Sequence, residues 1–581
     1  MSNITNIHSS FNHKKYRPYA PIQKSDRRWP NQVIESAPSW CSVDLRDGNQ
    51  ALIEPMTPTQ KLAMFKLLVD VGFKEIEVGF PAASAPDFDF VRQLIEQDLI
   101  PEDVTIQVLT QAREPLIARS FEALKGAKKA IMHLYNSTST VQREQVFKKS
   151  REEIKAIAVQ GAQWVRDFSI AQPETKWSFQ YSPESFTGTE MEYAVEVCDA
   201  VIDIWQPTLD NKVIINLPAT VESSTPNVYA DQIEWMCDNI SQRESVRISL
   251  HTHNDRGCGV AAAELGVLAG ADRIEGTLLG NGERTGNMDI VTMGMNLYSQ
   301  GIDPKLNFAD MDRIIATVER CTQLAVHPRH AYAGELVFAA FSGSHQDAIN
   351  KCMAIDAEKR AIDSETPWQV AYLPIDPRDL GRTYQQVIRI NSQSGKGGVA
   401  YVLEQDYGIQ IPRWMQVDFS PYVQQRAENS ETEVSSKVIH SIFTETYLLP
   451  QDSLTVGSYQ LNRQGNKDQI EAQISSVNGN SLLIGEGKGM LEAFVNGLSV
   501  AISSDIVLID YNEHALPSRK GAENEQAEAI AYVQLSVRGA RYCAAARCKD
   551  IVSASLQAVL NAVSRSDVDF SLCNKAKLAA I

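Results

Sequence analysis

The chain has 581 residues, enough for several domains, since a domain averages about 150 residues and one α/β barrel takes about 250. Its formal net charge of −17 argues against a general nucleic-acid or anionic-membrane binder, because both partners require a positive face. Nine cysteines without a C-x-x-C pair predict no disulfide framework and favour a reducing, cytoplasmic compartment. The sequence has no apolar run of about 18 residues and no apolar segment near the N-terminus, so we expect neither a transmembrane helix nor a signal peptide.

After an N-terminal arm over residues 1–37, residues 38–305 alternate short β-rich runs with helical stretches such as Pro58–Val71 and Arg143–Gln160. Several runs are almost wholly apolar, as strands buried on both faces should be. Eight strand-then-helix units of this kind predict an α/β fold, a (β/α)8 TIM barrel, as the catalytic domain. Because Trp164–Ile170 also alternates like a strand, we expect an extra hairpin in the fifth unit. The eight predicted strands are Trp40–Leu45, Glu75–Gly79, Val104–Leu109, Lys129–Leu134, Trp177–Tyr181, Val213–Leu217, Val246–His251 and Ala271–Thr277.

The rest of the chain predicts two further parts. Residues 306–427 have a helical and irregular pattern and are expected to form linker subdomains. A charged, Ser-rich stretch at 426–437 precedes a separate α+β domain over residues 428–581. The expected elements of this domain are strands over Ser441–Leu448, Leu454–Leu461, Gln469–Val477, Leu482–Ile484 and Ala529–Val537 and a last helix near Val552–Val563.

Three polar motifs follow three of the predicted barrel strands. They are DLRDGNQ at 44–50 after the first strand, HTHND at 251–255 after the seventh and GNGERTGN at 280–287 after the eighth. Active sites of TIM barrels lie at the carboxyl ends of the strands, and strands seven, eight and one are neighbours in a closed barrel. We therefore expect the three motifs to meet at one patch.

His251 and His253 are the leading candidates for metal ligands. Two residues apart on a strand, they point to the same face with backbones about 6.6 Å apart, so both imidazoles can reach one ion. Asp47 would add a carboxylate and Asn287 an amide oxygen. Two nitrogens with several oxygens and no sulfur favour Mg²⁺ or Mn²⁺, and the same ligands are compatible with catalytic Zn²⁺. An isolated H-x-H is usually two unrelated histidines, so this prediction depends on the convergence of the three motifs.

These motifs, S-x-DLRDGNQ, HTHND and GNGERTGN, resemble the three signatures of the alpha-isopropylmalate synthase and homocitrate synthase family. FQYSPESFTGTE at 179–190 and NLPATVESSTPN at 216–227 are similar to the isopropylmalate-forming branch. SGSHQDAINK, YLPIDPRDLGR and NSQSGKGGVAYVLE extend the resemblance to the longer class of the family, which has a C-terminal leucine-regulatory domain. The resemblance runs from about residue 15 to the end and is weakest over 430–581.

The resemblance implies a Claisen-type condensation of acetyl-CoA with 2-oxoisovalerate, followed by thioester hydrolysis that releases CoA. The 2-oxo acid would chelate the metal, and Arg46 would stabilise the negative charge that grows on the keto oxygen. Glu283 would hold Arg46 or the metal shell in place. The positions that match the family's 2-oxo-acid pocket are Leu109, His133, Ser182 and Thr220.

A base must also remove a proton from the acetyl methyl group. The resemblance assigns this step to Glu184, His345 and Tyr372 without deciding among them. Because His345 lies in the linker region, it would have to fold over a barrel, its own or that of a partner subunit. A histidine pKa near 6.5 suits acid–base work at neutral pH. The resemblance further implies a homodimer and activation by a monovalent cation such as K⁺.

A glycine-rich stretch, GEGKG at 485–489, resembles the loop of the family's regulatory domain that approaches leucine. Gly485, Gly487 and Gly489 would let backbone N–H groups come close to a carboxylate, so leucine is expected to inhibit the protein. The plain alternative is a turn between a strand and a helix. The spacing differs from G-x-G-x-x-G, and SGKGG at 394–398 lacks the first glycine and the Ser/Thr of a P-loop, so neither stretch supports NAD or ATP binding.

Three rival functions remain open on the sequence alone. Citramalate and homocitrate synthases share the barrel and the metal and differ in the 2-oxo acid that they accept. A metal-dependent amidohydrolase also carries H-x-H on a barrel, but on the first strand rather than the seventh. A non-catalytic leucine sensor would have no need for the intact set of site residues.

Overall fold

The computed structural model describes residues 13–340, 342–384, 396–430, 434–449, 454–476, 479–516 and 528–566. These residues form two compact units. The first runs to Val337 and includes Pro377–Arg382, and the second takes the described residues of Phe338–Asp376 and from Thr383 onward. The expected boundaries at residues 37, 305 and 427 remain predictions. Of the SGKGG stretch, residues 394 and 395 lie outside the described part of the chain, and the other three begin a helix over Lys396–Tyr407.

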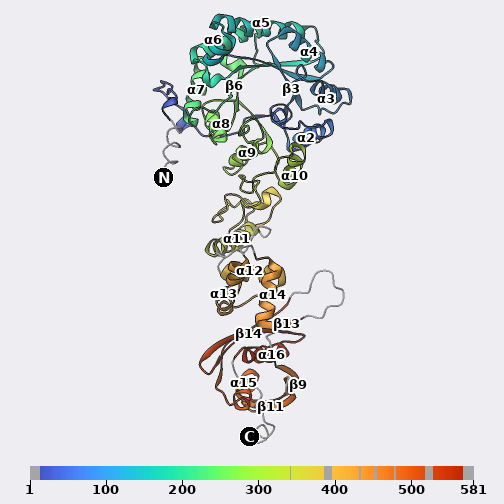
Figure 1. The fold of residues 1–581 in the computed structure, drawn as a ribbon, viewed down its shortest axis with the longest axis vertical. Helices are drawn as coiled ribbons and strands as arrows, with labels where there is room; N and C mark the ends of the chain where they lie inside the picture. The colour runs from blue at the N-terminus through green and yellow to red at the C-terminus, as the bar shows by residue number, and fades with distance from the viewer. Residues whose placement is uncertain are drawn as a thin grey trace, which may run out of the picture. The chain divides into compact units, whose positions relative to one another are not determined.

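The first unit contains a closed barrel of eight strands, β1 to β8, in sequence order. Every neighbouring pair is parallel, and β8 closes the barrel on β1 with Ser39 opposite Arg273 and Ser42 opposite Gly276. The predicted TIM barrel is therefore confirmed, and each predicted strand overlaps an observed one (Figure 1). The strands are β1 Ser39–Ser42, β2 Glu75–Gly79, β3 Thr105–Gln111, β4 Lys129–Ser137, β5 Lys176–Glu184, β6 Val213–Ala219, β7 Val246–Thr252 and β8 Arg273–Gly276.

Helices surround the barrel and are set by local signals in the sequence. α2 begins at Pro58 behind a capping box between Thr57 and Gln60, and it ends at Gly72, whose φ is +115°. The helix limits match the prediction. The helices of this unit are α2 Pro58–Val71, α3 Ala85–Glu96, α4 Glu114–Leu124, α5 Arg151–Ile170, α6 Met191–Trp205, α7 Pro226–Asn239, α8 Gly259–Leu268, α9 Ile290–Tyr298 and α10 Met311–Thr322.

The extra hairpin predicted at Trp164–Ile170 is wrong, because this segment is the last part of α5. A capping box between Ser150 and Glu153 starts the helix, and the buried positions recur with helical rather than strand spacing. The expected helix over Arg143–Gln160 is also divided: a π-helical turn at Gln142–Phe147 precedes Lys148, which has a φ of +54° and separates the turn from α5.

Part of the expected arm is anchored to α7. Residues 13–37 contain two short 3-10 turns, at His13–Lys15 and Trp29–Asn31. The buried carboxylate of Asp231 accepts hydrogen bonds from Arg27 (2.7 and 2.8 Å) and from the indole of Trp29 (2.9 Å). No helix among the described residues is long and apolar enough to cross a membrane.

The second unit combines helices with two antiparallel three-stranded sheets, ordered β11-β10-β9 and β12-β13-β14. Its sheet elements are β9 Thr455–Gln464, β10 Lys467–Ser476, β11 Gly479–Gly487, β12 Ile506–Ala515, β13 Ala529–Val537 and β14 Ala540–Cys548. Its main helices are α11 Gly343–Ile362, α12 Lys396–Tyr407, α13 Arg413–Ser430, α14 Ser436–Phe443, α15 Met490–Ala501 and α16 Ile551–Ser564. The α+β character expected for this region is confirmed.

Three elements of this unit differ from the prediction. Ser441–Leu448 is helical rather than a strand: α14 occupies its start, and a π-helical turn covers Thr444–Leu448. The strands β12 and β14 were not predicted. β12 is an edge strand with a largely polar second half, and the alanine-rich β14 has weak intrinsic strand propensity and forms between two cores.

The central strand of this sheet, β13, is buried on both faces. Ala531, Val533 and Leu535 on β13 pack into the core that includes α15 and α16. Ile530 and Tyr532, on the opposite face, pack into a second core built by α12, α13 and α14. Alternate residues of one strand therefore serve two separate cores, as the period of two along a strand requires.

Candidate functional site

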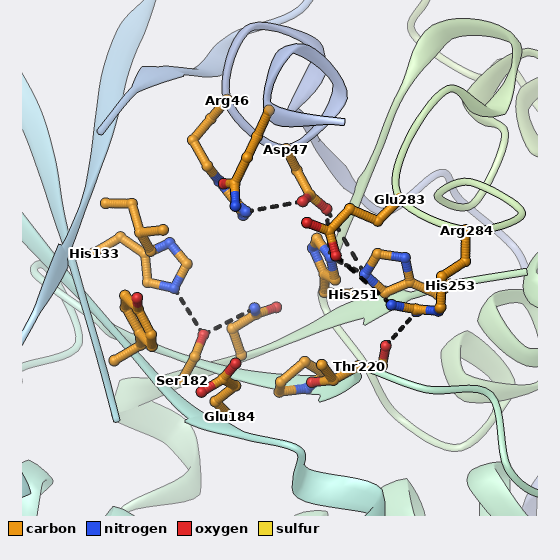
Figure 2. Close-up of a pocket in the computed structure, with 15 residues that line it drawn as sticks. Arg46, Asp47, His133, Ser182, Glu184, Thr220, His251, His253, Glu283 and Arg284 are labelled. Carbon is orange, nitrogen blue, oxygen red and sulfur yellow. Dashed lines mark hydrogen bonds and ion pairs between the residues drawn. The ribbon is translucent and has the colours of Figure 1, made fainter. Parts of the chain in front are cut away.

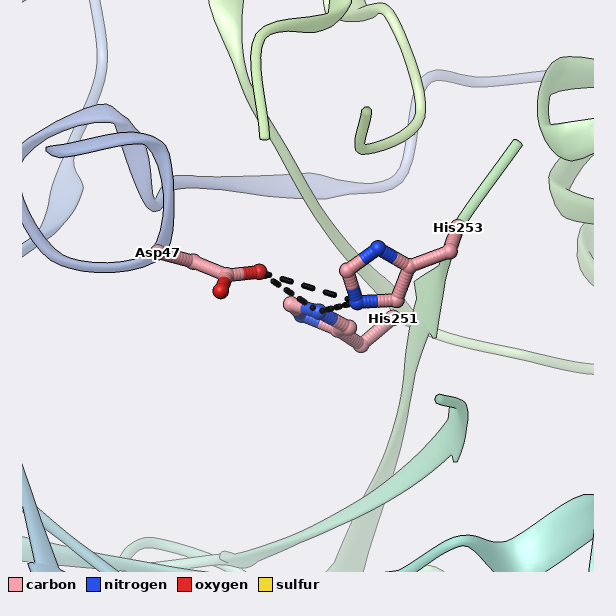
Figure 3. Close-up of side chains that lie close together, drawn as sticks. All are labelled: Asp47, His251 and His253. Carbon is pink, nitrogen blue, oxygen red and sulfur yellow. Dashed lines mark hydrogen bonds and ion pairs between the residues drawn. The ribbon is translucent and has the colours of Figure 1, made fainter. Parts of the chain in front are cut away.

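Three of the predicted ligands converge at the carboxyl ends of β1 and β7. Asp47 lies on a π-helical turn, Asp44–Gly48, directly after β1, and His251 and His253 lie at the end of β7 (Figure 3). The Oδ2 atom of Asp47 lies 3.2 Å from His251 Nε2 and 3.7 Å from His253 Nε2, and the two Nε2 atoms are 3.3 Å apart. Three atoms at these separations can all lie within about 2.0–2.2 Å of one point, the length of a metal–ligand bond.

Asn287 returns to the same place from the loop after β8. Its backbone forms an isolated antiparallel bridge with His253, and its Nδ2 donates a hydrogen bond to the carbonyl of Asn281 (3.0 Å). Its buried Oδ1 finds no hydrogen-bond donor among the described residues. A buried acceptor without a partner is costly, and a bound cation would satisfy it. The fit of these residues therefore supports a divalent-metal site.

Two glycines make this loop possible. A Cβ on Gly286, whose φ is +101°, would lie 1.9 Å from the carbonyl oxygen of Gly280. A Cβ on Gly282 would lie 2.2 Å from Asn287 Nδ2. Only glycine permits this close return of the chain, which explains the GNGERTGN pattern physically.

The charges of the metal-free cluster are strongly coupled. Burial favours the neutral acid, but Arg46 and the two imidazoles hold the pKa of Asp47 well below its usual range. Burial opposes protonation of His251, yet hydrogen bonds to Asp47 and Glu275 raise its pKa to about 9. Burial and the charge of His251 lower the pKa of His253 to about 4. The cluster thus gathers one anionic oxygen and two imidazole nitrogens in a dry site.

Arg46 is fixed beside the cluster by two carboxylates. Its Nη1 lies 3.2 Å from Asp47 Oδ1, and its Nε donates a short hydrogen bond to the fully buried Glu77. Burial alone would protonate Glu77, but Arg46 and His133 lower its pKa to about 2. Among the described residues, the carboxylate partners of Arg46 are therefore Asp47 and Glu77, and the role of Glu283 toward Arg46 or the metal shell stays a prediction. Glu283 lines the same pocket with its side chain half exposed, 3.8 Å from Arg284.

Three predicted substrate residues form one wall of the pocket together with Asn216 (Figure 2). His133 Nδ1 lies 2.7 Å from Glu77 Oε2, and its Nε2 lies 2.7 Å from Ser182 Oγ. Asn216 Nδ2 donates to the same Ser182 oxygen at 3.0 Å. Leu109 supplies an apolar side chain to the wall and is 7% exposed.

Glu184 and Thr220 line the same pocket, and Glu184 lies beside Ser182, which precedes it by two residues on β5 (Figure 2). Glu184 accepts a short hydrogen bond from Ser137, and Thr220 Oγ1 accepts one from the backbone N–H of Ser185 at 2.9 Å. Ser185 has a φ of +59°, a conformation unusual for a non-glycine residue. Arg284, which also lines the pocket, donates to the carbonyl of Thr220 and forms a salt bridge with Asp255.

The remaining predicted residues belong to the second unit. His345 and Tyr372 stack on each other with ring centroids 4.0 Å apart and an interplanar angle of 24°. Gly485 and Gly487 lie on β11, where a Cβ would come within 2.1 Å of Ala493 O and 2.4 Å of Ala493 N respectively. These two glycines thus allow α15 to pack closely on the strand. Gly489 is the N-cap of α15.

Sequence analysis missed the polar layer inside the barrel. Glu77, Gln107, Gln180, Asn216 and Glu275 point inward from five strands and are each at most 2% exposed. Each is a charged or amide side chain on a strand that is buried almost throughout, as in EIEVG and RIEG. A lone charged or amide side chain at an inward position of a buried strand was the available signal, because such a group requires partners.

Comparisons with known proteins agree with the fold and the site. Residues 37–318 match the HMGL-like family model, so the barrel with its polar mouth defines an HMGL-like enzyme domain. Residues 335–404 match the alpha-isopropylmalate synthase post-catalytic domain-like model, and residues 433–566 match the LeuA allosteric (dimerisation) domain. This last match supports dimerisation and regulatory binding.

Three curated relatives are similar over almost their entire length. The 2-isopropylmalate synthase of Alcanivorax borkumensis is 56% identical over 96% of this chain and 98% of its own. Those of Parafrankia sp. and Pseudomonas savastanoi pv. phaseolicola are 54% identical over 95% of this chain and 97% of their own. The chain belongs to the 2-isopropylmalate synthase family, as the sequence resemblance predicted. It is therefore an enzyme of the acyltransferase class.

Replacing Gly286 by alanine should weaken metal binding through Asn287. The added Cβ cannot occupy its position 1.9 Å from Gly280 O, so the loop must shift and carry Asn287 away from His253. We expect Mn²⁺ affinity, measured by electron paramagnetic resonance of free Mn²⁺, to fall at least about tenfold. Gly301→Ala is the matched control, because its φ is +78° and no atom lies within 4 Å of the added Cβ. Equal affinity in the two variants would contradict this account.

Proposed function

We propose that this enzyme condenses acetyl-CoA with 2-oxoisovalerate, hydrolyses the thioester and releases 2-isopropylmalate and CoA, in the cytoplasm, as the first committed step of leucine biosynthesis. The observation that carries the proposal is the convergence of Asp47, His251 and His253 beside Arg46 at the mouth of an HMGL-like barrel. The printed names of the relatives support the same reaction.

The residues of the site fit a divalent cation held by Asp47, His251 and His253, with the amide oxygen of Asn287 in reach of the same place. We propose Mg²⁺ or Mn²⁺, because the ligands are nitrogen and oxygen without sulfur, and Zn²⁺ is the alternative. When bound, the cation would polarise the keto group of the 2-oxo acid. Activation by K⁺ is proposed from the family resemblance alone.

Arg46 is proposed to stabilise negative charge on the keto oxygen as the new carbon–carbon bond forms. Its guanidinium is held rigidly by Glu77 and Asp47, so little reorganisation is needed during the reaction. The hydroxyl of Ser182 and the ring of His133 offer polar contacts to the acid on the adjacent wall. Leu109 offers an apolar contact for a branched side chain.

Removal of the methyl proton of acetyl-CoA is proposed to involve Glu184, His345 and Tyr372. Glu184 lies in the pocket and is held by Ser137. His345 and Tyr372 form one stacked pair and would act together on a barrel, that of their own chain or of a partner. The three residues are proposed as a group, with no single base assigned.

Release of free CoA tests the proposed reaction directly. Purified protein with acetyl-CoA, Mg²⁺ or Mn²⁺ and 2-oxoisovalerate should liberate thiol, and EDTA should abolish the release. We expect Asp47→Asn to lower kcat by at least about 100-fold, since it removes a charged ligand beside Arg46. Pyruvate and 2-oxoglutarate are the matched substrates: faster turnover of either would favour citramalate or homocitrate synthesis, and EDTA-resistant release would contradict the metal role.

The His345–Tyr372 pair can be tested against an internal control. His345→Ala should lower kcat by about 10²–10⁴-fold if the ring takes part in proton transfer. His440 stacks on Tyr407 with the same centroid distance of 4.0 Å, so His440→Ala is the matched control and should leave kcat near that of the wild type. An unchanged kcat and acetyl-CoA KM in His345→Ala would remove this residue from the mechanism.

We further propose that leucine inhibits the enzyme through the LeuA-type domain and that the stretch around Gly485, Gly487 and Gly489 contributes to this response. Millimolar leucine should suppress CoA release, and isothermal titration calorimetry should detect binding. No atom lies within 4 Å of a Cβ added at Gly489, so the Gly489→Ala variant should fold normally. Any change in its response to leucine would then report on the glycine-rich stretch rather than on folding. Full activity in millimolar leucine, with no heat of binding, would contradict regulation by leucine.

A further inference from the structure

A single buried carboxylate, that of Glu275, lies beneath the proposed metal site. Its side chain is fully buried. Oε1 accepts hydrogen bonds from Gln107 (3.3 Å), Gln180 (2.7 Å) and Arg273 (2.8 Å). Oε2 accepts from Asn216 (3.2 Å) and lies 3.0 Å from Nδ1 of His251. Groups from β3, β5, β6, β7 and β8 thus meet at one residue.

The contact with His251 determines which nitrogen of that ring is free. A carboxylate bound by this many donors acts as an acceptor, so the Nδ1 of His251 must carry the hydrogen. The lone pair of the neutral ring is then on Nε2, the atom that lies 3.2 Å from Asp47 and 3.3 Å from His253 Nε2. Glu275 therefore selects the tautomer and the ring orientation that can bind a cation.

Glu275 is itself held in place on several sides. Arg273, fully buried, donates to Glu275, to Ser249 Oγ (2.8 Å) and to Gln107 Oε1 (2.9 Å). It also donates to Glu75 at 2.5 Å, and no contact between Glu75 and His251 is found among the described residues. A charge fixed by so many partners has little freedom to rotate, and the imidazole that it orients is correspondingly rigid.

The same layer reaches Arg46. Gln107 Nε2 lies 3.3 Å from Glu275 Oε1 and donates to Glu77 Oε2 at 2.5 Å, and Glu77 in turn holds Arg46. The amide of Gln107 thus connects Glu275, which contacts His251, with Glu77, which contacts Arg46.

We propose that Glu275 is a positioning residue that sets the tautomer and orientation of His251 and thereby the affinity of the site for its divalent cation. This inference rests on the proposed function only in that it assumes that Asp47, His251 and His253 bind a metal.

The test is direct titration of the metal-free protein with Mn²⁺, followed by electron paramagnetic resonance or calorimetry. Glu275→Gln replaces the acceptor that faces Nδ1 by an amide of the same shape and should weaken Mn²⁺ binding about 10–100-fold. Glu275→Asp keeps the charge but withdraws it by one methylene, and should weaken binding in the same range. If the first variant does not fold, the second answers the question.

Glu75→Gln is the matched control, because it also removes a buried carboxylate partner of Arg273 but does not contact His251. It should bind Mn²⁺ within twofold of the wild type. Mn²⁺ affinity within twofold of the wild type in both Glu275 variants, or the same loss in Glu75→Gln, would overturn the positioning role. Failure of the wild type to bind Mn²⁺, or binding that survives Asp47→Ala, would instead overturn the metal site of the proposed function and this inference with it.

Discussion

Arg273 lies inside the barrel with no access to solvent and is compensated by two carboxylates, Glu75 and Glu275. Moving a charged group out of water costs several kcal/mol, and only close partners with good geometry recover that cost. The interior of this barrel is therefore constrained: each charge must have its partners at fixed positions, on its own strand or on others. The amides of Gln107, Gln180 and Asn216 complete the set.

This constraint is useful for catalysis because the buried polar layer contacts residues of the pocket and limits their movement. The side chains that line the pocket stand on a layer that has little freedom to rearrange. Arg46 and His251 come from different strands, yet each contacts one carboxylate of the layer, Glu77 and Glu275 respectively. A preorganised arrangement of this kind stabilises charge in a transition state without a rearrangement at the moment of reaction.

Much of the barrel and its mouth could be predicted from the sequence. Nearly continuous apolar runs defined the eight strands, and strand order brought Asp47 close to His251 and His253 by the closure of β8 on β1. Glu77 and Glu275 were missed because most of their partners lie on other elements, and the sequence of one strand does not show those contacts. The segment Trp164–Ile170 was compatible with both strand and helix spacing. The helix that contains it begins at the capping box of Ser150, which lies fourteen residues before Trp164 in the chain.

The C-terminal part was predicted less well for a related physical reason. Strand β14 is rich in alanine, and its burial comes from helices on both sides rather than from its own propensity. The glycines at 485 and 487 illustrate a second limit: the same pattern suits a ligand loop and close packing of a helix on a strand. The contacts of Gly485 and Gly487 with Ala493 provide a packing reason for both residues.

The sheet β12-β13-β14 joins what the sequence suggested were separate parts. Ile530, Tyr532 and Cys543 complete the core of α12, α13 and α14, although more than 80 residues separate them from the end of α14. A protein shortened at about residue 430 would lose α14 as well as the sheet, and would leave α12 and α13 with an uncovered apolar face. Such a chain would be prone to aggregate rather than simply lose regulation. Any shortened form of this enzyme that keeps α12 and α13 must therefore also keep the β12-β13-β14 sheet.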